Sequence, residues 1–94
     1  MTWEELIKDM NHWLDTAIPH TAQSDVFKFQ EESLEFIAEP SAEEAADIIM
    51  VLMHYCHLEG HDLKKSMIDK LEKNKKRSWS RQGDGTWHHI KDRS

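Results

Sequence analysis

The feature that most constrains the fold of this chain is the spacing of its apolar side chains, which recur at steps of three and four residues. In the first such stretch they extend from Trp3 to Ala17, and this period is typical of one face of an α-helix. Pro19, Pro40 and Gly60 interrupt the pattern, and these residue types commonly end helices. The sequence therefore predicts four helical segments and no sheet of consequence.

Local signals indicate where these helices begin. Thr2 and Ser41 each open a capping box, with a glutamate three residues later. Ser24 is placed to cap the second helix, after a predicted loop at 19–23. We expect a single all-α domain, a four-helix bundle-like chain over residues 1–94. Its predicted helices run over about residues 2–18, 24–38, 41–60 and 62–79, and a short tail at 80–94 is predicted as a turn and an irregular or extended piece.

The charge of the chain is divided between its middle and its end. Residues 29–63 contain nine acidic residues and no Lys or Arg, whereas residues 64–94 contain ten basic residues and four acidic ones. The formal net charge of −6 argues against a general nucleic-acid-binding protein. The longest apolar run, residues 48–53, is too short to cross a membrane. No signal-peptide pattern opens the chain, so we expect a cytoplasmic protein without a membrane partner.

Two pairs of carboxylates lie on the second and third predicted helices. Glu32 and Glu35 are three residues apart on the first of these helices. Glu44 and Asp47 have the same spacing on the next, so each pair shares a helix face. The short connection at Pro40 favours antiparallel neighbours, and converging carboxylates repel one another. A divalent cation relieves this repulsion, and oxygen ligands favour Mg²⁺ or Mn²⁺. The alternative is a set of solvated carboxylates on two helix surfaces.

The fourth predicted helix carries groups that suit a phosphorylated ligand. Lys70, Asn74 and Arg77 share a face, and Lys and Arg bind phosphate oxygens as a point charge and a planar fork. Trp79 offers a ring that can stack on a base. The alternative is a basic, solvated helix end that is stabilised by the helix dipole.

Three histidines at helical spacing allow a different metal. His54, His57 and His61 lie at steps of three and four residues, but neither an HExxH motif nor a cysteine cluster accompanies them, since Cys56 is the single cysteine. We favour a polar helix face or a subunit interface over a zinc site.

Taken in order, the motifs resemble those of one known family, the MazG-like all-alpha nucleoside triphosphate pyrophosphatases. Lys28 leads into "EESLE" at 31–35, "EAAD" follows at 44–47, and "KLEKNKKRSW" occupies 70–79. The tail "GDGTWHHIKD" at 83–92 is similar to the end of a small phage-associated subgroup linked to dATP and dGTP. The connection between the two acidic motifs is shorter here than in larger members of the family.

The resemblance implies a fold, a reaction and a set of roles. The fold is a MazG-type helical chain that assembles as a dimer or a dimer of dimers, which the small core of 94 residues also favours. The implied metal ligands and catalytic residues are Glu32, Glu35, Glu44 and Asp47. The implied substrate-binding residues are Lys28, Lys70, Asn74, Arg77 and Trp79.

The implied reaction is hydrolysis of a nucleoside triphosphate to the monophosphate and pyrophosphate. A metal-activated water attacks the α-phosphorus, with Mg²⁺ as the expected cofactor and Mn²⁺ as a substitute. Either Glu35 or Glu32 orients the water, and the sequence does not choose between them. A phage-encoded protein would work in the host cytoplasm. The alternative function is a helical module that binds nucleotide and metal without hydrolysis.

Overall fold

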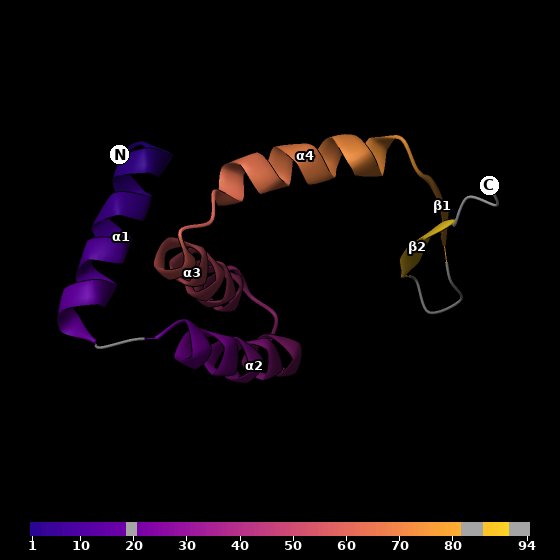
Figure 1. Cartoon of the computed structure of the whole chain (residues 1–94). Coiled ribbons are helices and arrows are strands. Elements are labelled where there is room, and N and C mark those ends of the chain that lie inside the picture. The colour runs from indigo at the N-terminus through magenta and orange to yellow at the C-terminus, as the bar shows by residue number, and fades with distance from the viewer. Residues whose placement is uncertain (19–20, 82–85, 91–94) are drawn as a thin grey trace. The chain divides into compact units, whose positions relative to one another are not determined.

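The computed structural model of the chain describes residues 1–18, 21–81 and 86–90, and Figure 1 shows its elements in chain order. The chain divides into two compact units, residues 1–62 and 63–94; the prediction of a single domain stays a prediction. The first unit contains three helices, and the second contains one helix and two strands. The elements are α1 (Trp3–Ala17), α2 (Ala22–Ala38), α3 (Ala42–Glu59), α4 (Leu63–Lys75), β1 (Ser78–Arg81) and β2 (Trp87–Ile90). The four-helix, mainly α-helical fold is confirmed.

Helix α2 begins earlier than predicted, because Thr21 and not Ser24 is its cap. The Thr21 hydroxyl accepts a hydrogen bond from the Ser24 backbone N–H at 3.1 Å. The Ser24 hydroxyl in turn accepts one from the Thr21 backbone N–H at 3.0 Å. This reciprocal pair satisfies two donors that a helix start otherwise leaves without partners. The loop was predicted over residues 19–23, but its last two residues belong to α2, which begins at Ala22.

Helix α3 has the ends that the sequence indicates. The Ser41 hydroxyl accepts a hydrogen bond from the Glu44 backbone N–H at 3.1 Å. At the other end Gly60 adopts a φ of 69°, in the left-handed region that favours glycine. Only Glu39, Pro40 and Ser41 connect α2 to α3, and α3 returns beside α2 (Figure 1).

In the second unit, α4 ends at Lys75, so the prediction that it reaches Trp79 was wrong. In a continuing helix the Asn74 carbonyl would accept from the backbone N–H of Ser78. It accepts instead from the Arg77 backbone N–H at 3.2 Å and from the Trp79 indole N–H at 2.9 Å. The helical ladder stops there, and the chain enters β1.

Strands β1 and β2 form an antiparallel pair in which Ser78 lies opposite Ile90. The tail at 80–94 was predicted as a turn and a short irregular or extended piece. Its extended part is thus paired with the residues that follow α4. The predicted turn at Gly83 and Gly85 lies outside the described residues.

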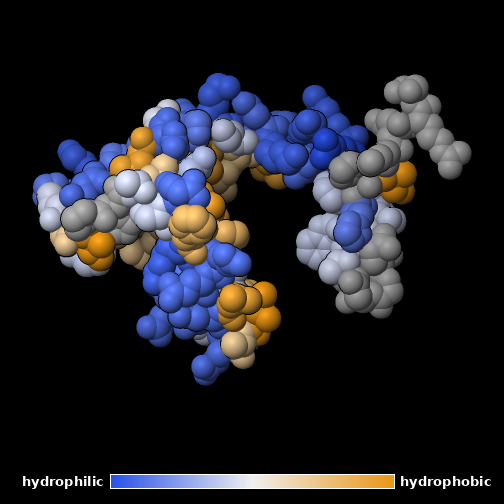
Figure 2. All heavy atoms as spheres, turned by 60° about the horizontal axis from the view of Figure 1, so that its bottom comes forward, coloured by the Kyte–Doolittle hydropathy of each residue, from blue (hydrophilic) through white to orange (hydrophobic). Residues whose placement is uncertain are grey.

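The interior of the first unit is unusually polar. Among the residues whose side chains are described, Met10 is the one buried hydrophobic residue, and it is 8% exposed. The buried polar side chains are Asn11, Asp25, Glu32 and His54. Large apolar side chains lie open instead, and Figure 2 shows them as orange groups at the surface. Among the described helices, none has the length and apolar character needed to cross a membrane.

Candidate metal and nucleotide site

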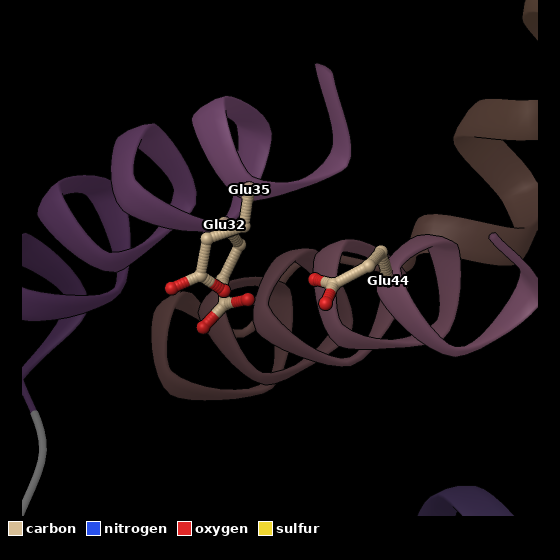
Figure 3. A group of neighbouring side chains, drawn as sticks. All are labelled: Glu32, Glu35 and Glu44. Carbon is tan, nitrogen blue, oxygen red and sulfur yellow. The ribbon is translucent and has the colours of Figure 1, made fainter. Parts of the chain in front are cut away.

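Helices α2 and α3 bring three carboxylates together. Glu32, Glu35 and Glu44 each offer an oxygen, and these oxygens lie within 4.8 Å of one another. Figure 3 shows the two side chains of α2 and the one of α3 directed toward the same space. The sequence predicted that carboxylates of these two helices converge, and their role as metal ligands stays a prediction.

Local structure explains this convergence. Glu32 and Glu35 are one turn apart on α2, so their side chains leave the helix on one side. Glu44 lies in the first turn of α3, where Ser41 caps its backbone N–H. The three-residue connection around Pro40 holds this turn close to α2.

Their proximity changes the acidity of two of these glutamates. A side-chain hydrogen bond with Glu32, together with the charge of Glu32, raises the pKa of Glu35, and Glu44 adds a smaller repulsion. Burial raises the pKa of Glu44, followed by repulsion from Asp47 and Glu32. The folded chain therefore resists full ionisation of this cluster.

The cluster also contains polar atoms that the protein leaves unsatisfied. In the part of the chain that the structure describes, Oε2 of Glu32 and Oε2 of Glu44 are buried and have no hydrogen-bond partner. Buried carboxylate oxygens usually have a partner, and hard divalent cations prefer oxygen ligands. The donor set and its two orphaned oxygens thus fit a cation such as Mg²⁺ or Mn²⁺.

Asp47 and Lys28, two further predicted site residues, lie beside this cluster. Asp47 stands outside the group of three converging oxygens, one turn after Glu44, and it lines an adjacent hollow together with Lys28 and Glu32. Lys28 Nζ lies 2.7 Å from Glu31 Oε2 and 3.2 Å from Glu32 Oε1. These contacts with Glu31 and then Glu32 raise the pKa of Lys28. A lysine just before the acidic stretch therefore neutralises part of its charge.

The remaining predicted residues lie in the second unit. Lys70 is exposed on α4, Asn74 and Arg77 are half-buried, and Trp79 belongs to β1. Among the described residues, Oδ1 of Asn74 is buried without a partner, so it is an acceptor available to a ligand. The Trp79 indole is already bonded to the Asn74 carbonyl, which fixes its ring beside the end of α4.

The sequence prediction missed a cluster of ionisable residues, of which Asp25 and His54 line the same hollow. His54, predicted as part of a polar helix face or interface, is fully buried, with Asp25 and Asp15 at its two ring nitrogens. His57 also contacts Asp15, at 2.9 Å. No spacing rule connects these positions, because His54 is 29 residues from Asp25 and 39 from Asp15.

Comparison with known proteins places this geometry in a family. The family model for dATP/dGTP pyrophosphohydrolases matches residues 6–94. The chain belongs to this family. The MazG-like resemblance inferred from the motifs is thereby confirmed.

Two relatives of this pyrophosphohydrolase-family chain are informative. A dATP/dGTP diphosphohydrolase of Salmonella phage PMBT28 is 29% identical over 94 residues, which make up 97% of the chain and 32% of the relative. The chain thus spans about a third of the length of that relative. A solved structure, described as a cyanophage S-2L MazG-like pyrophosphohydrolase bound to dGDP and three catalytic Mn²⁺ ions per active site, is 28% identical. It matches with a TM-score of 0.79, over 98% of this chain and 96% of its own.

The raised pKa of Glu35 predicts how pH and metal affect the stability of this family member. Because its pKa in the folded chain lies above the ordinary value of 4.5, the stability that Glu35 contributes is present below pH 4.5. It is lost as the pH rises through the folded pKa. In a metal chelator, Glu35→Gln should therefore become more stable than the wild type between pH 4.5 and pH 7. Urea unfolding at several pH values measures this difference.

Added Mg²⁺ should reverse the order at pH 7 if the cluster holds the cation, because the variant would then lack one of the predicted ligands. Glu39→Gln, at an exposed position beyond the cluster, is the matched control and should keep most of the metal response. If Glu35→Gln were less stable than the wild type in chelator at pH 7, repulsion of Glu35 by Glu32 and Glu44 would not be destabilising the folded chain.

Proposed function

We propose that the chain is a divalent-metal-dependent nucleoside triphosphate pyrophosphohydrolase that converts dATP or dGTP to the monophosphate and pyrophosphate. In this reaction a water oxygen bonds to the α-phosphorus while the bond from that phosphorus to the bridging oxygen breaks. The observation that carries the proposal is the convergence of Glu32, Glu35 and Glu44. One carboxylate oxygen of Glu32 and one of Glu44 are buried there without a hydrogen-bond partner. Membership of the dATP/dGTP pyrophosphohydrolase family supports the choice of reaction.

The proposed metal ligands are the four predicted carboxylates, Glu32, Glu35, Glu44 and Asp47. The first three already converge, and Asp47 lies one turn further along α3, beside the same hollow. When bound, a divalent cation neutralises phosphate charge and lowers the pKa of a coordinated water. Mg²⁺ is the expected cofactor with Mn²⁺ as a substitute, and the S-2L relative is described with Mn²⁺.

A carboxylate of the cluster also has a role in proton transfer. The hydrogen bond with Glu32 raises the pKa of Glu35, and a carboxylate with a raised pKa is suited to accept a proton. We therefore propose that Glu35 orients and deprotonates the attacking water, which is the choice that the sequence left open.

The proposed substrate-binding residues are chosen by their chemistry. Lys70 and Arg77 bind triphosphate oxygens and stabilise the charge that builds on the leaving pyrophosphate. Asn74 uses its unsatisfied Oδ1 as an acceptor, and Trp79 offers a ring that is held in place by its bond to the Asn74 carbonyl. Lys28 lines the hollow and its Nζ contacts the Glu32 carboxylate, so it can exchange this carboxylate for a phosphate oxygen.

The names of the relatives support purine deoxynucleotides as substrates. The phage PMBT28 relative is a dATP/dGTP diphosphohydrolase, and the S-2L relative is described with dGDP. Since both are phage proteins, we place the activity in the cytoplasm of a host cell.

A panel of four dNTPs and four NTPs with Mg²⁺ tests the reaction, with products separated by chromatography. We expect the monophosphate and pyrophosphate from dATP or dGTP. Glu35→Gln should lower turnover by at least about a hundredfold, the usual range when acid–base catalysis is removed. Asp47→Asn should also lower turnover strongly, because it removes a proposed metal ligand. Glu39→Gln should stay close to the wild type, because its position lies outside the cluster.

Other outcomes separate the alternatives. Diphosphate and phosphate as products would show attack at a different phosphorus. Absence of turnover, with nucleotide at about a hundred times its Kd stabilising the fold by roughly 2.7 kcal/mol, would identify a non-catalytic binding module. Near-wild-type turnover by both ligand variants would contradict the proposed ligand set.

We also propose that the chain works as a homodimer or a dimer of dimers. Phe27, Leu34 and Ile37 are 65%, 62% and 71% exposed, and their spacing places them along one side of α2. A chain of this size buries only about 60–65% of its unfolded surface as a monomer, and exposed apolar patches mark association surfaces. A second copy covering this stripe would provide the hydrophobic core that one chain lacks.

Sedimentation analysis tests the assembly. The wild type should sediment as a dimer or tetramer, and Leu34→Glu should shift it toward the monomer because the new charge cannot be buried without a partner. Gln23→Glu adds the same charge at an exposed polar position in the first turn of α2 and should leave the assembly intact. A monomeric wild type at micromolar concentration would contradict the proposal.

A further inference from the structure

His54 is the one fully buried large side chain among the described residues, and charged groups surround it. Its Nδ1 lies 2.8 Å from Asp25 Oδ2, and its Nε2 lies 2.9 Å from Asp15 Oδ1. Asp25 is itself 2% exposed, whereas Asp15 is partly open to solvent and also contacts His57. The most buried position of the first unit is therefore an ionisable network.

The two ring nitrogens of His54 face two different carboxylates. A neutral imidazole carries a hydrogen on one nitrogen only, so it cannot donate to two carboxylates at once. The imidazolium donates through both nitrogens, and each carboxylate balances part of its charge. Hydrogen bonds from His54 and then His57 hold the pKa of Asp15 below its usual value, so Asp15 remains an acceptor.

This network connects three helices. Asp15 lies in the last turn of α1, Asp25 in the first turn of α2, and His54 in the second half of α3. The contacts of the His54 ring with Asp15 and Asp25 are thus both contacts between helices. Removal of one partner from a buried ionic group is costly because it leaves the other charge uncompensated, so the network strongly favours one placement of α1.

The placement of α1 matters because its last turns form a wall of the hollow beside the metal cluster. Trp13 and Leu14 of α1 and its capping residue Ile18 supply that wall, and Lys28, Glu32 and Asp47 lie among the other lining residues. The hollow has a volume of about 240 Å³, below the roughly 300–1,000 Å³ of sites that enclose a whole drug-sized ligand. It therefore suits one portion of a nucleotide.

The chemistry of the lining indicates which portion. An anionic triphosphate is repelled by carboxylates unless a cation lies between them, whereas a planar base gains from stacking and apolar contact. Trp13 is 52% exposed in the single chain, so its ring is available for such contact. The base side of the substrate thus fits the wall that α1 provides.

We propose that Asp15, His54 and Asp25 act as positioning residues, which hold the Trp13 wall at a set distance from the metal-binding helices and so determine how tightly the nucleoside portion binds. This inference rests on the proposed pyrophosphohydrolase function. It assigns a role to a buried network that the metal and phosphate chemistry does not use.

The first test compares Asp15→Asn with Asp9→Asn, which removes the same charge from an exposed position on α1. Asp15→Asn should raise the KM for the best dNTP by about tenfold, equivalent to about 1.4 kcal/mol, and leave kcat within about twofold. The stabilisation by Mg²⁺ alone should stay unchanged, because the cluster is built on α2 and α3. Asp9→Asn should match the wild type in all three measurements.

The second test uses the wild-type protein and needs no variant to fold. Nuclear magnetic resonance of ¹⁵N-labelled histidine at pH 6 should show two slowly exchanging ring N–H protons for His54. The ring of His61, which is exposed, should show none because its protons exchange with water. A single ring N–H for His54 would overturn the network of two donated bonds.

The outcomes also distinguish this inference from the function on which it rests. An active wild type whose KM is the same in Asp15→Asn and Asp9→Asn would overturn the positioning role and leave the proposed function standing. A loss of Mg²⁺ stabilisation in Asp15→Asn would overturn it too, since the residue would then act on the metal cluster. A wild type that turns over no nucleotide would overturn the proposed function, and the nucleoside role with it.

Discussion

Mutual repulsion among Glu32, Glu35 and Glu44 is the constraint on which the account of this chain depends. Their oxygens lie within 4.8 Å of one another, and the pKa values of Glu35 and Glu44 are raised as a result of their surroundings. A fold under no functional demand would separate such groups, because like charges and orphaned buried oxygens both cost stability. A bound cation would offset this cost, and this explains why a short helical hairpin holds the three carboxylates together.

Much of this cluster is encoded locally, which is why the sequence predicts it. Spacing of three residues places Glu32 and Glu35 on one side of α2, and the Ser41 cap together with Pro40 determines where Glu44 lies. The end of α4 was mispredicted because a local side-chain contact, the hydrogen bond from the Trp79 indole to the Asn74 carbonyl, competes with the helical ladder, and helical spacing does not reveal it. The His54 network escaped prediction for a different reason, since its partners come from two other helices.

The polar interior links the site to the assembly of the protein. Because this chain buries polar groups such as Asp25 and His54 while apolar side chains on α2 stay open, ionic contacts orient α1 within one chain. In the proposed homodimer or dimer of dimers, a neighbouring copy would supply the hydrophobic contribution. Under this proposal the polar contacts define one geometry, and association supplies the burial that a short chain lacks.

Anomalous scattering from crystals grown with Mn²⁺ and a non-hydrolysable dGTP analogue is the most direct measurement of the central claim. The account predicts manganese peaks between α2 and α3, within ligand distance of Glu32, Glu35 and Glu44, with Asp47 turned toward the same ions. It also predicts phosphate oxygens of the analogue on the metal. Manganese bound only elsewhere, or saturating Mn²⁺ that leaves the three glutamates without a metal, would contradict it.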